Sequence, residues 1–211
     1  MKRFTDMATL IAEFGDKKGS LEDSDLSYIQ VEGIDFAGHS LSGAQIHGSV
    51  FTHVKLDGCN LNGAFIQDGD FSGVTFTKAQ LENTFFQRVD LTGCTFAGAV
   101  LHGVSFFLCQ LPGAHFTQCQ MEGAKFLETN LEGADFTGAH VPGGDFRESE
   151  LTDVLFHDCH LNQADFRKTN IFVASFQNMS IDGALYYGKS PWDGKAKQED
   201  WKNKMTIFDG E

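Results

Sequence analysis

The feature that most constrains this chain is a repeat of five residues. An apolar residue recurs at every fifth position from Leu21 to Tyr186, without one slip of frame. We call this central residue position 0 and number its repeat from −2 to +2. The −2 residue is usually small, the −1 residue polar and the +2 residue often glycine. Alternation at −2, −1 and 0 predicts a strand of three residues there, with two side chains pointing inward.

The two remaining residues of each repeat are expected to turn the chain. In two repeats they are Pro112-Gly113 and Pro142-Gly143. Proline followed by glycine is typical of a type II turn, whose third residue needs a positive φ. A strand and a corner every five residues predict a four-sided coil of 20 residues. At 20 residues per coil, residues 20–188 would make about eight coils, stacked about 4.8 Å apart.

Several segments carry a family resemblance, namely CNLNG (59–63), VDLTG (89–93), TNLEG (129–133) and ADFTG (134–138). They resemble the pentapeptide repeat family over about residues 20–188. The resemblance implies an all-β fold, a right-handed quadrilateral β-helix. Some members of the family imitate DNA, bind the type II topoisomerases DNA gyrase and topoisomerase IV, and confer quinolone-type resistance. Loops that project from the coils of some such relatives have no counterpart in this unbroken frame.

The central residues predict a filled interior. Phenylalanine alternates with smaller residues from Phe76 onward, so two opposed columns of rings are expected. All five cysteines stand at −2, where small buried side chains belong: Cys59, Cys94, Cys109, Cys119 and Cys159. His140 and His160 are 20 residues apart, and we interpret them as a polar ladder in preference to a metal pair. We expect no enzyme activity and no catalytic, cofactor or metal site.

The net charge of the chain limits the kinds of molecule that it is expected to bind. Acidic residues outnumber basic ones by 29 to 16, a net charge of −13. This balance argues against nucleic acid or an anionic membrane and allows a cationic protein surface. No apolar run approaches the roughly 18 residues of a membrane span, and no signal peptide precedes the repeats. An odd number of cysteines without a CxxC pair favours the cytoplasm.

The coil of 20 residues sorts side chains onto four faces, numbered from the central residues Leu21, Leu26, Val31 and Phe36. Faces one and three have acidic residues but no lysine or arginine. The acidic residues of face three are Glu32, Asp70, Asp90, Glu132, Glu150 and Asp153. Such a surface could imitate DNA and bind a topoisomerase. Alternatively, the charge only keeps the rod soluble.

Face two breaks the repeat pattern with apolar residues where polar ones or glycine are expected. These residues are Phe65, Phe85, Phe107, Leu108 and Leu127. A cluster of this kind usually marks a contact site. The alternative function is therefore a general scaffold that binds a protein through this patch. The patch could also be covered by the terminal helices.

The ends of a solenoid need covers. In residues 1–19 we predict a capping helix from Thr5 to Phe14, with Thr5 as N-cap, Gly15 as its end and Met7, Leu10, Ile11 and Phe14 on one face. In residues 189–211, Ser190 and Pro191 begin a second predicted helix, on which Trp201, Met205 and Phe208 share a face. This tail either caps the last coil or joins two rods into a homodimer.

Overall fold

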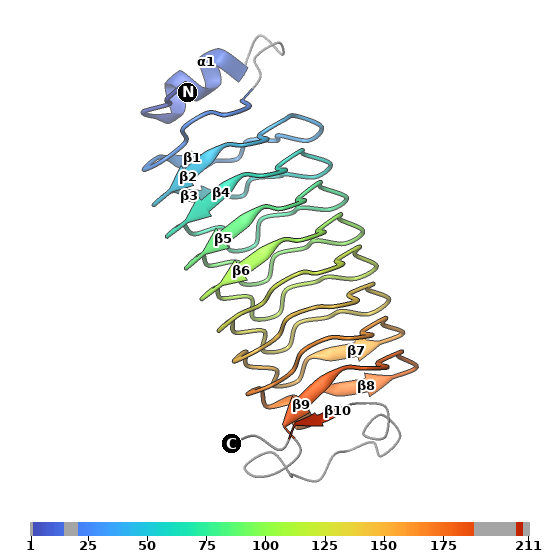
Figure 1. Cartoon of the computed structure of the whole chain (residues 1–211). Helices are drawn as coiled ribbons and strands as arrows, with labels where there is room; N and C mark the ends of the chain where they lie inside the picture. Colours follow the sequence, from blue (N-terminus) through green and yellow to red (C-terminus); the bar gives the residue numbers. More distant parts are fainter. Residues whose placement is uncertain (1, 15–20, 188–205, 209–211) are drawn as a thin grey trace.

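The computed structural model describes residues 2–14, 21–187 and 206–208, and in it the repeats form a four-sided rod (Figure 1). Parallel bridges join residues 20 apart, from Asp25–Gln45 at one end to Asp165–Leu185 at the other. The unbroken register confirms the predicted coil of 20 residues. Residues of the same repeat position therefore form straight rows along the rod.

The named strands are all three residues long and centred on position 0. Face two holds the four-stranded sheet β2-β4-β5-β6, whereas β1-β3 lie on face three and β7-β8 on face four. Their bounds are β1 (Gln30–Glu32), β2 (Gln45–His47), β3 (Val50–Thr52), β4 (Phe65–Gln67), β5 (Phe85–Gln87), β6 (Ser105–Phe107), β7 (Leu155–His157) and β8 (Ser175–Gln177). The predicted strand from −2 to 0 was therefore wrong by one residue.

Each corner is built around a +2 residue in the left-handed region. In turns such as Leu61–Ala64, the N–H at −2 donates to the carbonyl at position 0, at 2.9 Å. Sixteen glycines and 16 other residues have positive φ, as the type II interpretation requires. Among the described +2 positions the exception is Val173, a β-branched residue, and there Ile171–Val173 form the 3₁₀ helix η1 instead.

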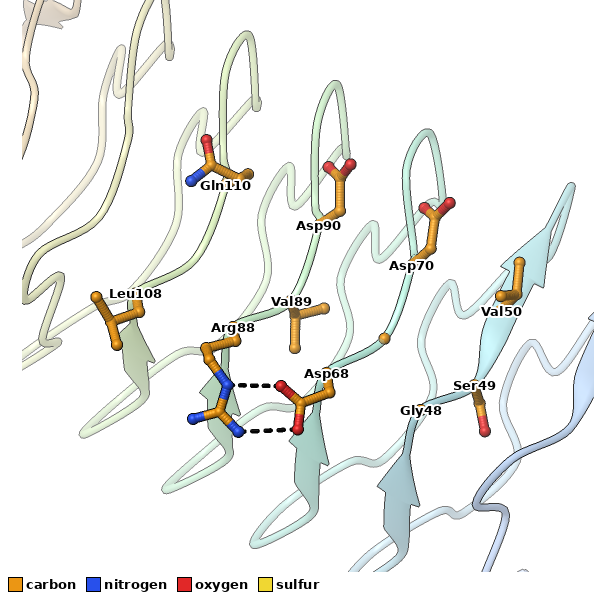
Figure 2. A pocket seen from close by; sticks show the side chains of 11 residues that line it. Gly48, Ser49, Val50, Asp68, Asp70, Arg88, Val89, Asp90, Leu108 and Gln110 are labelled. Atoms are coloured by element: carbon orange, nitrogen blue, oxygen red, sulfur yellow. Dashed lines mark hydrogen bonds and ion pairs between the residues drawn. The ribbon is translucent and has the colours of Figure 1, made fainter.

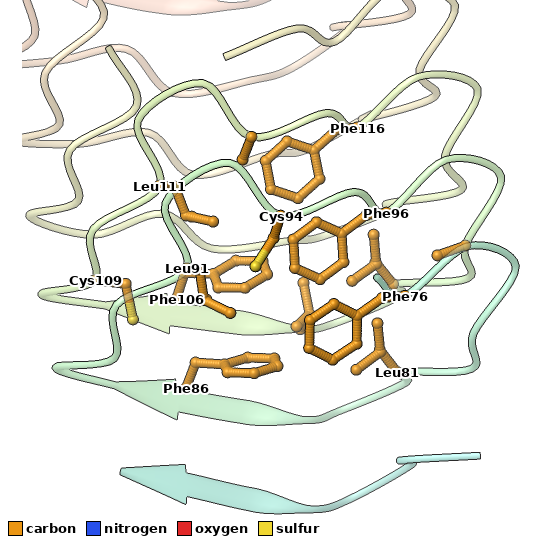
Figure 3. Close-up of a cluster of buried hydrophobic side chains, with 14 of the residues drawn as sticks. Phe76, Leu81, Phe86, Leu91, Cys94, Phe96, Phe106, Cys109, Leu111 and Phe116 are labelled. Carbon is orange, nitrogen blue, oxygen red and sulfur yellow. The ribbon is translucent and has the colours of Figure 1, made fainter. Parts of the chain in front are cut away.

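The interior is filled by the two predicted columns of phenylalanine (Figure 3). Within a column, rings from successive coils stack with centroids 4.7–5.2 Å apart. Rings of opposite columns meet edge to face at 5.6–6.5 Å. Every predicted central residue from Leu21 to Tyr186 is buried. The rod therefore has a solid core of the density typical of protein interiors.

The five cysteines are buried and free of disulfides, as predicted. Burial raises the pKa of Cys59, Cys94, Cys119 and Cys159 to about 12 and that of Cys109 to about 11. Their thiols stay protonated at neutral pH, and Cys94 Sγ lies 3.0 Å from the carbonyl oxygen of Phe71. They are packing residues, not nucleophiles.

The N-terminal helix is present as α1 (Met7–Phe14). Its N-cap is Asp6, since Asp6 Oδ1 accepts a 2.8 Å hydrogen bond from Thr9 N, so the predicted Thr5 cap was wrong by one residue. That bond also lowers the pKa of Asp6. Leu10 is buried as predicted, whereas the side chains of Met7, Ile11 and Phe14, and the predicted end at Gly15, lie outside the described residues.

A short segment before α1 was not predicted at all. Phe4 is buried, and its N–H donates to the carbonyl of Asp25 at 2.9 Å. Arg3 forms a parallel bridge with Asp25. The first residues thus extend face two by one row and place a ring over the end of the core.

The C-terminal end is also covered by a strand. β10 (Thr206–Phe208) pairs in parallel with β9 (Leu185–Tyr187), with Ile207 opposite Tyr186. The predicted helix is therefore wrong for Thr206–Phe208, and Ser190, Pro191, Trp201 and Met205 lie outside the described residues. Dimerisation through this end stays a prediction.

Two neighbouring phenylalanines test the inward and outward assignment. Phe106 is fully buried and Phe107 is half-buried. Phe106→Ala should lower the free energy of unfolding by about 3–5 kcal/mol because it leaves a cavity in the ring column. Phe107→Ala should cost about 1 kcal/mol or less. Urea denaturation followed by circular dichroism measures both, and equal losses would contradict the assignment.

Candidate protein-binding surface

The outward apolar residues of face two begin with a pair of stacked rings. Phe65 and Phe85 are opposite each other in the pairing of β4 with β5. Their ring centroids are 5.1 Å apart and the planes are inclined by only 9°. Both side chains are half-buried and stand in the −1 row. The stack is a preformed aromatic surface on a rigid sheet.

The next two coils carry apolar residues in the +1 row. Phe107 is opposite Gln87 in the pairing of β5 with β6, and Leu127 lies one coil further along. The carbonyl of Leu127 accepts a 3.1 Å hydrogen bond from Leu108 N. Diagonal neighbours on a sheet are about 7–8 Å apart, so Phe85 is within reach of Phe107. The five predicted residues therefore lie together on face two, as an apolar stripe that crosses the sheet diagonally.

Leu108 stands at the corner between faces two and three, with φ +56° and 37% of its surface exposed. Tyr28 occupies the same row four coils earlier, with φ +60° and 67% exposed. Its ring lies over Gly48 and meets the His47 ring edge to face at 4.9 Å. The sequence analysis missed Tyr28, although a large aromatic residue at +2 is the same kind of signal that identified Leu108.

The charges of face two are largely paired with one another. Arg88 binds Asp68 through two hydrogen bonds, Nε–Oδ1 at 2.6 Å and Nη2–Oδ2 at 2.8 Å. The Arg88 guanidinium lowers the pKa of Asp68. Further ion pairs join Arg147 to Asp145, Arg167 to Asp165 and Lys168 to Glu148. Four of the five basic residues in the repeats of face two are therefore ion-paired within the face, whereas Lys125 is exposed and has no ion pair among the described residues.

The acidic residues of face three have a different environment. Asp70 Oδ1 accepts hydrogen bonds from Ser72 N at 2.9 Å and from Ser72 Oγ at 2.7 Å. Asp90 Oδ1 accepts one from Thr92 N at 2.9 Å. No ion pair involves either residue within the described part of the chain, and in both the recorded bonds use Oδ1. Oδ2 of each carboxylate is thus available to a partner.

The predicted apolar patch of face two and the predicted acidic residues of face three meet in a hollow of about 340 Å³ at the corner between the two faces (Figure 2). Asp70, Asp90 and Gln110 stand in a row on one side, and Asp68, Arg88 and Leu108 stand on the other. Gly48 and Gly69 also line the hollow, and they leave this space open because they have no side chains to fill it. Apolar and acidic groups are therefore offered side by side.

The other acidic residues of face three lie away from the hollow. Glu32 is near the N-terminal end, whereas Glu132, Glu150 and Asp153 are exposed on later coils. Glu150 accepts hydrogen bonds from the side chains of Thr152 and Asn170. The structure brings Asp70 and Asp90 together on adjacent coils, places Glu132 on the coil next to that of Glu150 and Asp153, and leaves Glu32 apart.

The described residues contain few groups arranged for catalysis or metal binding. No group of three histidine, cysteine or acidic residues could hold a metal ion there. The His140 and His160 rings are 5.3 Å apart, and His160 Nδ1 lies 3.0 Å from Ser180 Oγ. Among the same residues, no helix has the length and apolar character needed to cross a membrane.

The corner conformation of Leu108 predicts an unusual mutational result. A left-handed backbone costs a residue with a Cβ about 1–2 kcal/mol. Leu108→Gly removes this strain whereas Leu108→Ala keeps it, so the glycine variant should be the more stable by about 1 kcal/mol. Thermal unfolding of the two variants side by side measures the difference. A more stable alanine variant would show that the corner does not require a positive φ.

Comparison with known proteins supports the fold. The family model "Pentapeptide repeats (8 copies)" matches residues 24–63, and the model "Pentapeptide repeat region" matches residues 67–136 and 109–186. No curated protein matches the chain.

Solved structures have the same architecture. Full-length QnrB1, a plasmid-mediated fluoroquinolone resistance protein, aligns with a TM-score of 0.67 and 17% identity over 86% of this chain and 89% of QnrB1. HetL from the cyanobacterium Nostoc sp. strain PCC 7120, a pentapeptide repeat protein involved in heterocyst differentiation regulation, aligns with a TM-score of 0.57 and 15% identity over 92% of this chain and all of HetL. The chain belongs to the pentapeptide repeat family and has the right-handed quadrilateral β-helix that the resemblance implied.

Proposed function

We propose that this chain is a non-enzymatic, protein-binding rod whose acidic faces imitate DNA for a type II topoisomerase such as DNA gyrase. One observation carries the proposal. Face three presents six acidic residues, has no lysine or arginine in its own repeats, and its acidic residues have no ion pair among the described residues. On face two, by contrast, neighbouring basic residues neutralise most of the acidic ones. Both faces contain acidic residues, so it is the placement of lysine and arginine that distinguishes face three from face two.

Acidic residues lie along the rod about as densely as phosphates lie along the axis of DNA. Residues 20–186 contain 21 acidic residues. At about 4.8 Å per coil the rod is about 40 Å long, so it carries roughly one acidic residue per 2 Å. Duplex DNA carries about one charge per 1.7 Å of its axis. The seven lysines and arginines of the same segment make its net charge −14, so the net charge density is lower than that of DNA, at roughly one charge per 3 Å.

The likeness to QnrB1 supports the choice of partner, because that protein is described as one of plasmid-mediated fluoroquinolone resistance. HetL has the same architecture and is described in a different process. The fold is thus compatible with more than one partner, and the face-three charges must be tested directly.

The test uses variants that remove charge but keep the turn hydrogen bonds. Asp70→Asn, Asp90→Asn, Glu132→Gln and Glu150→Gln together retain a side-chain oxygen at each position. Asp35 and Asp135 on face four make the same bond, to Ala37 N at 2.9 Å and Thr137 N at 2.8 Å. Asp35→Asn with Asp135→Asn is therefore the matched control.

Competition of the rod with labelled DNA for purified gyrase gives the readout. We expect the face-three variant to compete about tenfold less well, with a smaller dependence on salt, since charge attraction is screened by ions. The face-four control should compete as the wild type does. The proposal is wrong if wild-type protein at high micromolar concentration neither displaces DNA nor changes supercoiling.

A further inference from the structure

The apolar stripe and the hollow form one continuous surface at the corner between faces two and three. We propose that this surface binds a basic amphipathic helix of a partner protein. The inference goes beyond the proposed function, because it adds the apolar stripe of face two and names the kind of segment that binds there, although the hollow shares Asp70 and Asp90 with face three. It also holds whether or not the partner is a topoisomerase.

The spacing of the stripe suits a helix. Its apolar residues occupy four consecutive coils, so the stripe spans three steps of about 4.8 Å. An α-helix advances about 5.4 Å per turn, and its residues i, i+4 and i+7 lie on one face. Successive apolar residues of a helix would therefore contact successive rows, first the Phe65–Phe85 stack and then Phe107 with Leu127.

The charges around the stripe select a basic helix. Arg88 Nε and Nη2 are already bound to Asp68, and Lys125 is the one basic residue in the repeats of face two without an ion pair among the described residues. Asp70 and Asp90 across the hollow, and the exposed Glu128 beside Leu108, have no ion pair among the described residues. Lysine and arginine place an aliphatic stem on apolar surface and a charged head near carboxylates. Leu108 and the two aspartates offer both parts of such a site within one hollow (Figure 2).

The backbone conformation of Leu108 also supports a binding role for this surface. Glycine fills half of the positive-φ corners, and Leu108 is exposed enough that the core gains little from it. Residues held in a strained backbone conformation cluster at binding and functional sites, and the outward Phe107 beside Leu108 is consistent with such a site. A second copy of this chain is a poorer occupant, because its net charge of −13 would bring acidic rims against acidic rims.

The experiment measures binding of a fluorescein-labelled, 18-residue peptide with leucines on one helical face and lysines on the others. A peptide of the same composition in scrambled order controls for charge alone. Phe107→Ser with Leu108→Gly removes the stripe at positions +1 and +2. Thr117→Ser with Gln118→Gly changes the same two positions on face four and is the matched control.

Fluorescence anisotropy should show at least tenfold weaker binding of the helical peptide to the face-two variant and no change with the control. Asp70→Asn with Asp90→Asn should weaken binding and reduce its salt dependence. The inference is overturned if the face-two variant binds as the wild type does, or if the scrambled peptide binds equally well. It is also overturned if sedimentation shows a wild-type dimer that the face-two variant abolishes, because a second copy then occupies the surface.

Discussion

The whole rod depends on one backbone requirement, a positive φ at the +2 position of every repeat. This conformation turns the chain so that the next −2 side chain points inward, and at corners such as Leu61–Ala64 the N–H at −2 also donates to the carbonyl at position 0. Where the requirement cannot be met, at the β-branched Val173, the corner becomes a 3₁₀ turn. Because each corner repeats, every side chain is assigned to a face by its place in the frame and not by its local sequence.

The same backbone explains why the repeats are acidic. At the turn corners described, the N–H at +1 has no recorded main-chain acceptor. The side chain at −1 often accepts a hydrogen bond from this N–H, as Asp25 does from Ser27 N and Asp35 does from Ala37 N. Pro112 and Pro142 stand at this +1 position, where a missing N–H costs nothing. Aspartate at −1 is therefore partly a structural residue. What distinguishes a candidate binding face is the absence of neighbouring cations.

Much of this could be predicted from the sequence, since a frame without slips fixes the core, the ring columns, the buried cysteines and the common face of Phe65, Phe85, Phe107, Leu108 and Leu127. The extra row at Phe4 could not be predicted from the sequence, because residues 5–20 separate Phe4 from the first repeat. β10 was missed because its apolar spacing also fits a helix. The hollow extends over four successive coils, where Gly48 and Gly69 leave space beside the larger side chains of Asp68, Arg88 and Leu108. Such a feature depends on side-chain directions that a repeat pattern does not contain.

Disulfide formation between engineered cysteines tests most directly whether the frame assigns each residue to a face. In the parent chain, residue 87 is opposite residue 107, so cysteines at Gln87 and Phe107 should crosslink and cysteines at Gln87 and Thr117 should not. Deleting residues 94–103 keeps the five-residue frame and the stacking of rings on rings, but moves all later residues by two faces. The account predicts that the deletion reverses the two results. A Gln87–Phe107 crosslink that survives the deletion would contradict it.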